Sequence, residues 1–377
     1  MVMLLNKNQE LSLKERFLNL NFIFIGIIAV LAFIGCATLY SVAGGSFLPW
    51  AFNQGVRFII GLIILFVAAL IPPEFYYKIA TPVYIITLMM LIFVDVAGHI
   101  GMGAQRWINL GFFNLQPSEL MKIAIVLELA KYFSNVPLET VRTIKGMIIP
   151  VILVAVPVAF IMLQPDLGTS LMILFCAVFL FYIAGVQWWK FALAGGAVIA
   201  ATPILWHFLH GYQKDRILTF LDPERDPLRA GYHIIQAKIA LGSGGMWGKG
   251  FLSGTQSHLN FLPEPHTDFI FTTFSEEFGM LGGVVILFLN LILITYGYWF
   301  AFRIHNNNYF GKMVILGLNT NYFLYVFINI AMVTGLLPVV GIPLPLISYG
   351  GTVILSVMMS FGIMLSFYVN RDRELKK

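Results

Sequence analysis

Ten long apolar runs, one after another, constrain this chain more than any other feature of its sequence. The runs cover residues 20–42, 54–71, 79–98, 118–134, 146–164, 167–185, 190–209, 278–302, 312–334 and 350–370. Each has about 17 to 25 residues, enough for a helix to cross the hydrocarbon core of a bilayer. The chain is 59% hydrophobic and 11% charged, whereas soluble domains are about half apolar and a quarter charged. The sequence therefore predicts an all-α integral membrane protein with about ten transmembrane helices and a large outer loop between the seventh and the eighth.

The basic residues predict how the chain is oriented in the membrane, because cytoplasmic segments carry an excess of Lys and Arg. If the N-terminus lies inside, most of the 23 Lys and Arg residues fall on inner segments: Lys7, Lys14, Arg16, Lys78, Lys131, Arg142, Lys145, Lys190, Arg303, Lys312, Arg371, Arg373, Lys376 and Lys377. Both termini are therefore predicted to be cytoplasmic. The net charge of +5 then reflects membrane topology, and we expect no nucleic-acid partner.

Polar residues gather toward the outer ends of the predicted spans, while the middle portions are almost free of charge. Charged side chains inside a bilayer are costly, so where they occur they indicate function. Transporters usually place polar groups and broken helices at mid-bilayer. The distribution here argues against an ion-coupled transporter and directs attention to the outer segments.

The first outer segment is GMGAQRWINLGFFNLQPSELMK, residues 101–122. Its glycines and Pro117 predict a short re-entrant or interfacial element in front of a span. Ser118 is a plausible N-cap for that span, because serine caps helices well.

Two Glu-x-x-Lys pairs follow on the same predicted helix. Glu119 and Lys122 are three residues apart and can pair on one face. The pair is either structural, because charges in a membrane need partners, or part of a site. Glu128 and Lys131 repeat the spacing toward the inner end, where a structural pair is favoured.

The second outer segment, LQPDLGTS at 163–170, is a proline-broken hairpin between two apolar runs. Asp166 is placed to cap the following helix. Gln164 is an odd choice for turn formation alone, so a polar contact inside the bundle is an equal alternative.

The third outer segment, 210–277, is the longest loop in the chain, and loops of this length are usually functional. Its run GYHIIQAKIALGSGG has the apolar spacing of a short helix on the membrane face. The DPERDP stretch at 222–227 has the composition of a solvated turn.

Within that segment, GSGGMWGKG at 242–250 resembles a phosphate loop but lacks the Walker A pattern. Ser243 stands where the first glycine is required, and Gly250 follows Lys249 where Ser or Thr is required. Two interpretations remain open: an anion-binding nest of backbone N–H groups near Lys249, or a plain turn.

The stretch FLPEPHTDFIFTTFSEEF, 261–278, places acidic residues among aromatic ones at the start of an apolar run. Partial desolvation raises the pKa of a carboxyl group and makes its carboxylate a stronger base. Asp268 is therefore a candidate general base, and His266 is interpreted as a polar contact. Glu276 and Glu277 are either further site residues or interfacial charges that hold the next helix at its depth.

Residues 335–351, GLLPVVGIPLPLISYGG, contain Pro338, Pro343 and Pro345 and cannot form one regular helix. Irregular backbone is tolerated at membrane depth only where protein buries it or water reaches it. We predict a re-entrant outer loop that either closes a cavity or contacts substrate.

Five motifs in this order resemble the SEDS family (shape, elongation, division and sporulation), the integral membrane peptidoglycan glycosyltransferases. They are GAQRWINLGFFNLQPSELMKIA, QPDLGTS, RILTFLDPERDPLRAGYHIIQAKIALGSGG, GTQSHLNFLPEPHTDFIFTTFSEEFG and GLLPVVGIPLPLISYGGT. The resemblance covers nearly the whole chain, so we expect one polytopic domain over residues 1–377. GAQRW, TFLDPERDP, GYHIIQ and GTQSHLNFLPE resemble the elongation branch more than the division branch. Arg229 and Pro265 depart from the usual pattern without touching the candidate base.

The resemblance implies roles for the matching residues. Asp268 matches the proposed catalytic aspartate, which removes the proton from the 4-hydroxyl of the acceptor sugar as it attacks the anomeric carbon of lipid II, with inversion. Undecaprenyl pyrophosphate is the leaving group. The residues implied to surround or bind substrate are Arg106, Trp107, Glu119, Lys122, Gln164, Asp166, His266 and Ser348, and Lys238 and Lys249 join Arg106 and Lys122 as candidate cations for the leaving group.

The resemblance also implies a setting: the bacterial inner membrane, with the active face outward. A class B penicillin-binding transpeptidase and other membrane proteins of the elongation complex are the implied partners. A divalent cation, Mg²⁺ or Mn²⁺, is the implied cofactor, although no ligand set stands out in the sequence. Two alternatives stay open, a lipid II flippase and a non-catalytic scaffold for a transpeptidase. The charge-poor spans disfavour the first, and the intact HTD motif disfavours the second.

Overall fold

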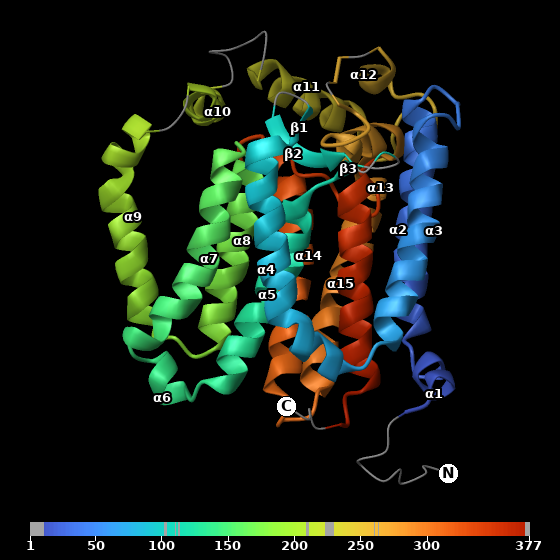
Figure 1. Ribbon diagram of the computed structural model, residues 1–377. Coiled ribbons are helices and arrows are strands. Elements are labelled where there is room, and N and C mark those ends of the chain that lie inside the picture. Colours follow the sequence, from blue (N-terminus) through green and yellow to red (C-terminus); the bar gives the residue numbers. More distant parts are fainter. Residues whose placement is uncertain are drawn as a thin grey trace.

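The computed structural model describes residues 11–101, 104–109, 111, 114–208, 211–222, 230–259, 261–262 and 264–373. These residues form a bundle of long helices (Figure 1). The helices are α1 (Leu13–Leu18), α2 (Phe22–Val42), α3 (Trp50–Leu70), α4 (Pro73–Ala97), α5 (Pro117–Asn135), α6 (Leu138–Val141), α7 (Lys145–Leu163), α8 (Leu167–Ile183), α9 (Trp188–Phe208), α10 (Gly211–Leu221), α11 (Ala230–Ser243), α12 (Thr255–His258), α13 (Ile270–Arg303), α14 (Tyr309–Val333) and α15 (Gly351–Val369). The strands and α10, α11 and α12 lie at one end of the bundle, and the short helices α1 and α6 lie at the other (Figure 1).

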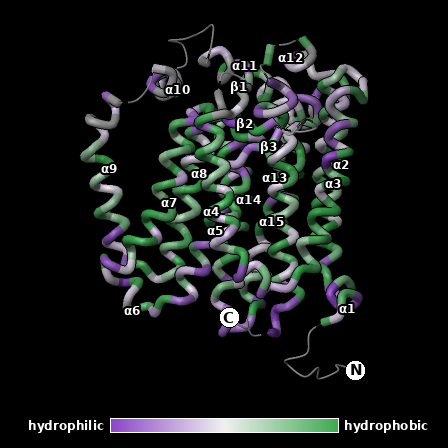
Figure 2. Tube along the Cα trace, viewed as in Figure 1, coloured by the Kyte–Doolittle hydropathy of each residue, from purple (hydrophilic) through white to green (hydrophobic). Residues whose placement is uncertain are grey.

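Each predicted span corresponds to one long helix. Within the described residues, seven helices are long and apolar enough to cross a membrane, namely α2, α3, α4, α7, α13, α14 and α15. The apolar helix α8 is slightly shorter, and α5 and α9 run alongside the others (Figure 1). Hydrophobic residues line the middle of the long helices and hydrophilic ones gather toward both ends (Figure 2). The chain is therefore an all-α membrane protein with about ten transmembrane helices.

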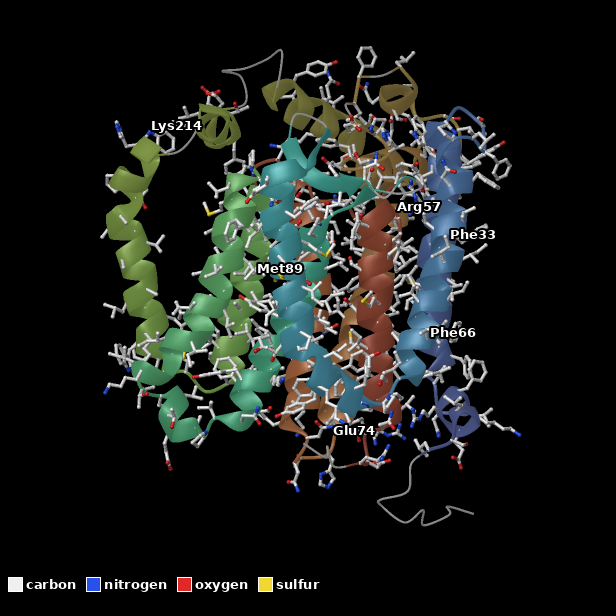
Figure 3. All side chains as sticks on the ribbon, viewed as in Figure 1. Phe33, Arg57, Phe66, Glu74, Met89 and Lys214 are labelled. Carbon is white, nitrogen blue, oxygen red and sulfur yellow. The ribbon has the colours of Figure 1, made fainter. Side chains whose placement is uncertain are left out.

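Two helices form the centre of the bundle. In α14 and α15, 78% and 72% of the most apolar window is buried, against 28% in α3. α14 packs against α5, α8, α13 and α15. The circumference of the bundle is apolar. Phe33 is 75% exposed and Met89 is 63% exposed (Figure 3), as expected for side chains that face lipid.

Helix starts test several of the predictions. Asp166 caps α8 as predicted, since Thr169 N–H donates to Asp166 Oδ1 at 3.2 Å. The prediction that Ser118 caps α5 is wrong: Gln116 is the N-cap, and Pro117 occupies the first helical position. Proline is favoured there because its fixed φ suits the helix and its missing N–H would have no helical partner.

A short helical segment precedes the eighth span and is separated from it by a kink. α13 starts at Ile270 and continues through a break at Gly279, whose φ is 69°. Glu276 and Glu277 therefore lie in the first turns of the helix, where they are 0% and 1% exposed. The alternative that these two residues are interfacial charges holding the helix at its depth is wrong, because both side chains are buried inside the protein.

The short element predicted in front of α5 is a small antiparallel sheet of β1 (His99–Gly101), β2 (Ala104–Asn109) and β3 (Asn114–Leu115). The long segment 210–277 contains α10, α11 and α12. The predicted short helix is α11, whose residues Ala237 and Ala240 are fully buried; α11 packs on α13. Residues 223–227 of the DPERDP stretch lie outside the described residues.

Residues 334–350 connect α14 to α15 without helical structure, as the three prolines predict. Leu344, Leu346 and Ile347 in this loop are buried. The loop lies at the same end of the bundle as the sheet, while α1 and the end of α15 lie at the other end (Figure 1).

Candidate active site

Three consecutive carbonyl groups directly before α13 each accept a hydrogen bond from a distant part of the chain. The bonds run from Tyr349 N–H to His266 O (2.8 Å), from the Ser348 hydroxyl to Thr267 O (2.7 Å) and from Asn329 Nδ2 to Asp268 O (3.0 Å). The first two donors belong to the loop 334–350 and the third to α14. The backbone of Asp268 is thereby fixed by residues more than sixty positions further along the sequence.

The same loop forms a wall beside the carboxylate of Asp268. Gly341 has a φ of 74°, which glycine adopts without steric cost. A Cβ built on this residue would lie 3.3 Å from Asp268 Oδ2. Asp268 is half-buried, so its carboxylate is partly desolvated, as the candidate base requires.

Ser348 is engaged on both sides of its hydroxyl. The oxygen accepts from Leu344 N–H at 2.7 Å and the hydroxyl donates to Thr267 O. Gln54 of α3 donates to the Ser348 carbonyl at 2.9 Å, and the residue is 4% exposed. These bonds favour a positioning role over the predicted contact with substrate.

His266 lies flat against an aromatic ring at the rim of the site. Its imidazole stacks on Trp50 with ring centroids 4.6 Å apart, and its Nε2 lies 3.4 Å from a carboxylate oxygen of Glu264. Burial lowers the pKa of His266, and the charge of Glu264 opposes that shift. The lowered pKa favours the neutral ring, and Nδ1 is buried with no hydrogen-bond partner within the described residues.

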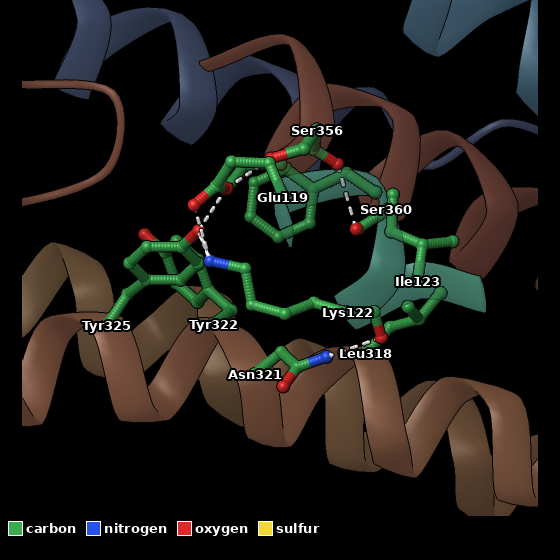
Figure 4. A pocket seen from close by; sticks show the side chains of 11 residues that line it. Glu119, Lys122, Ile123, Leu318, Asn321, Tyr322, Tyr325, Ser356 and Ser360 are labelled. Carbon is green, nitrogen blue, oxygen red and sulfur yellow. Dashed lines mark hydrogen bonds and ion pairs between the residues drawn. The ribbon is translucent and has the colours of Figure 1, made fainter. Parts of the chain in front are cut away.

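The predicted pairing of Glu119 and Lys122 is confirmed inside the bundle (Figure 4). Lys122 Nζ lies 2.6 Å from Glu119 Oε1, and both residues are 3% exposed. The Tyr325 hydroxyl bonds to both charged groups, and Ser356 donates to Glu119 Oε2 at 3.1 Å. These side chains line a pocket between α5, α14 and α15. Tyr325 is one helical turn from Asn329, so this pair lies directly beneath the Asp268 segment.

Arg106 holds the turn between α7 and α8. Its Nε donates to Gln164 O at 2.9 Å and its Nη2 to Pro165 O. Gln164 Nε2 in turn donates to Leu91 O at 3.0 Å, which confirms a polar contact inside the bundle. Trp107 follows Arg106 on β2 and is half-buried. Arg106 therefore stabilises the backbone of this turn through hydrogen bonds to two of its carbonyl groups.

Asp166 joins that turn to the helix that carries Glu119. Besides capping α8, its Oδ2 accepts from Gln116 Nε2 at 3.1 Å, directly before Pro117. A Cβ built on Gly168 would lie 3.0 Å from the Ile342 side chain. The hairpin therefore contacts the same loop that fixes Asp268.

Lys249 lies apart from these residues. Its Nζ is 2.6 Å from Glu276 Oε1 and 2.7 Å from Thr255 Oγ1. The N–H groups of Lys249 and Gly250 donate to the carbonyls of Glu276 and Glu277 at 3.0 and 2.9 Å. Because α13 engages these groups, the turn interpretation of GSGGMWGKG holds and the anion nest does not.

Two basic residues at this end of the bundle form no ion pair within the described residues. Lys238 of α11 is exposed, and its side chain lies against Gly335, the second residue after α14. Arg57 of α3 is half-buried, with its guanidinium carbon 4.3 Å from the ring centroid of Tyr349. Its Nη1 is buried and makes no hydrogen bond within the described residues.

The sequence predictions missed Arg57 and Asn329. An arginine inside the apolar run 54–71 was the available signal for Arg57. The signal for Asn329 was an amide inside the run 312–334, which a search limited to ionisable residues passes over. Tyr325 carried no signal, since a tyrosine in an apolar helix is common.

Within the described residues, no group of three or more His, Cys, Asp or Glu side chains could hold a metal ion.

Comparison with known proteins decides the family. The chain matches a family model described as a cell cycle protein, FtsW/RodA/SpoVE, over residues 15–373. The chain belongs to the FtsW/RodA/SpoVE family. This FtsW/RodA/SpoVE member is 46% identical over 312 residues to the peptidoglycan glycosyltransferase MrdB of Escherichia coli (strain K12), covering 82% of this chain and 83% of that protein. The resemblance to the SEDS family is confirmed.

Two solved structures share the fold of this FtsW/RodA/SpoVE member. One is described as the structural coordination of polymerization and crosslinking by a peptidoglycan synthase complex; it has a TM-score of 0.80 and 28% identity, covering 93% of this chain and 98% of that chain. The other is the rod shape determining protein RodA of Thermus thermophilus, with a TM-score of 0.71 and 24% identity, covering 93% and 97%.

Proposed function

We propose that this chain is a peptidoglycan glycosyltransferase that polymerises lipid II into glycan strands during cell elongation, with Asp268 as its general base. The observation that carries the proposal is the placement of Asp268, a half-buried carboxylate fixed at one end of an apolar bundle. The 46% identity to a relative named peptidoglycan glycosyltransferase supports the reaction class.

The proposed step begins when Asp268 takes the proton from the 4-hydroxyl of the acceptor sugar. The oxygen forms a bond to the anomeric carbon of the donor with inversion. The bond from that carbon to the pyrophosphate breaks, and undecaprenyl pyrophosphate leaves with the electron pair. A positioned general base typically accelerates such a step by about 10² to 10⁴-fold. The polyprenyl tail can stay in the membrane while the sugars react at the end of the bundle.

The leaving pyrophosphate gains charge and needs cations placed where that charge appears. Lys122 and Lys249 are already paired with glutamates, at 2.6 Å each, and Arg106 donates to backbone carbonyls. Arg57 and Lys238 are therefore the cations we assign to this role. His266 is proposed as a contact for substrate at the rim of the site, through its ring face.

A divalent cation, Mg²⁺ or Mn²⁺, is a further proposal from the family alone. Among the described residues, no group of three or more His, Cys, Asp or Glu side chains is placed to hold a metal ion, and the steps above involve protein groups only. Mg²⁺ is commonly held by one or two carboxylates, substrate phosphates and water. A titration of cation and chelator during polymerisation checks the requirement.

The chain is a multi-pass protein of the inner membrane, and we propose that the end bearing Asp268 faces outward. Both termini would then be cytoplasmic, which the basic residues near them support. In this arrangement residues 1–377 are one polytopic domain, with 210–277 as its long outer loop and 335–351 as a re-entrant loop.

A class B penicillin-binding transpeptidase is the partner we propose, together with other membrane proteins of the elongation complex. The support is the structural neighbour described as a peptidoglycan synthase complex that coordinates polymerization and crosslinking. Lipid II is proposed as both the donor and the acceptor of the reaction.

The test is polymerisation of purified lipid II, with divalent cation and the partner transpeptidase present, by the wild type and by Asp268→Asn. Asp372→Asn at the opposite end, 86% exposed in its side chain, is the control. Glycan chains from the wild type and the control but not from an equally folded Asp268→Asn support the base. If Asp268→Asn makes chains normally, the assignment is wrong. If none makes chains where a known polymerase does, the flippase and scaffold alternatives replace the proposal.

A further inference from the structure

Asn329 stands out among the buried polar residues that the mechanism does not use. It lies on α14, is 0% exposed, and donates both hydrogens of its amide. Nδ2 lies 3.0 Å from Asp268 O and 2.7 Å from Ile342 O. Only the orientation with Nδ2 toward these two carbonyl oxygens supplies a donor to each.

The two acceptors flank the carboxylate of Asp268. One is the carbonyl of Asp268 itself. The other belongs to Ile342, the residue after Gly341, whose Cβ position would be 3.3 Å from Asp268 Oδ2. One amide therefore sets the separation between the base and the wall of loop backbone beside it.

We infer that Asn329 is a positioning residue for the base, which holds the Asp268 carboxylate at a fixed distance from the loop 334–350. The inference rests on the proposed function of Asp268. Asn329 does not touch the reacting atoms, because both of its donors are used on the backbone.

A purely structural role is the competing account, because amides often join helices in membrane proteins. What separates the two accounts is where the donated hydrogen bonds end. Both bonds from Asn329 end on backbone next to the Asp268 carboxylate, at Asp268 O and Ile342 O.

The chain provides a matched control on the same helix. Asn319 is also 0% exposed, and its Nδ2 donates to Ile294 O at 3.0 Å. Its Oδ1 and that of Asn329 are both buried without a partner within the described residues. Asn319 thus shares residue type, helix and burial with Asn329, but its bond joins α14 to the middle of α13.

The experiment compares Asn329→Ala, Asn329→Asp and Asn319→Ala in the lipid II polymerisation assay with the full-length chain. Misplacement of a reacting group by about 1 Å can cost about 10²-fold in rate. We expect Asn329→Ala to lose about that factor in kcat with KM unchanged, and Asn319→Ala to keep the wild-type kcat. Asn329→Asp keeps the shape and, when its carboxyl is protonated, one of the two donors, so its kcat should fall between those of the wild type and Asn329→Ala.

Thermal unfolding of each variant separates positioning from folding. The inference is overturned if both Asn329 variants keep the wild-type kcat, or if Asn319→Ala loses as much kcat as Asn329→Ala. It is also overturned if neither Asn329 variant folds where Asn319→Ala does. Full activity of Asp268→Asn would instead remove the proposed base, which is a different failure from a normal Asn329→Ala beside an inactive Asp268→Asn.

Discussion

Helix α5 carries the Glu-x-x-Lys pattern twice, and its two ends use the pattern differently. At the end near Asp268, Lys122 and Glu119 touch directly at 2.6 Å. At the other end, the predicted direct pairing of Glu128 and Lys131 is wrong: each bonds instead to Thr81 of α4, which donates to Glu128 at 2.9 Å and accepts from Lys131 at 3.0 Å. The first pair is buried and the second is half-buried.

The difference shows how surroundings decide what a charge pair does. In the buried pair, Tyr325 and Ser356 from two other helices make the hydrogen bonds to Glu119 and Lys122 that the ion pair itself leaves unmade. Charges out of reach of water interact strongly and are costly to leave alone. The Glu119–Lys122 pair therefore rigidly joins three helices one turn of α14 from the residue that holds the Asp268 backbone. Glu128 and Lys131 join two helices through Thr81.

The largest effect is expected for Lys122→Ala. The substitution leaves Glu119 buried without its cation, and removing one partner of a buried pair typically costs about 3–5 kcal/mol. We expect a loss of that size in the free energy of unfolding, measured by denaturant titration in mixed micelles. The double variant Glu119→Gln with Lys122→Met removes both charges and should lose less than Lys122→Ala alone. A double variant that is worse than the single one would contradict a buried, mutually compensating pair.

Tyr325→Phe should have an intermediate effect. It removes only the hydroxyl that bonds to Glu119 and Lys122 and leaves the ion pair in place. Loss of a hydrogen bond to a buried charged group costs about 1–3 kcal/mol. The same titration measures it, and Tyr322→Phe on the same helix is the control, because that hydroxyl donates to Asn290 Oδ1, an uncharged group. Equal losses in the two variants would show that charge adds nothing at this position.

These partners mark the limit of what the sequence could predict. Spacing along one helix was enough for the Glu119–Lys122 pair, because i,i+3 residues share a face. Tyr325 and Ser356 lie more than 200 positions further on, so no local pattern indicates them. Asn329 differs from them: its amide inside the run 312–334 was a local signal, but its two backbone acceptors lie in other segments and have no local pattern.

The fold was predictable to the degree that length and hydropathy determine it. All ten spans were placed, because a helix that crosses a bilayer needs a long apolar run. The local errors have local causes. The start of α5 differs from the prediction by two positions because Pro117 at the first helical position, rather than Ser118 at the cap, marks it. The sheet of β1, β2 and β3 gives little signal because its strands are short. The helical segment before the kink at Gly279 lies outside the predicted run because its two glutamates lower its hydropathy.

The smallest effect is expected for Lys131→Ala. The residue is half-buried, its ammonium bonds to the uncharged Thr81, and the ring centroid of Tyr77 is 5.3 Å away. Partly hydrated pairs of this kind contribute about 0–1 kcal/mol, and Glu128 keeps its bond from Thr81 when the lysine is removed. We expect a change in the free energy of unfolding within that range and normal polymerisation of lipid II. A loss as large as that of Lys122→Ala would mean that the sequence pattern, and not its burial, determines the energy of both pairs.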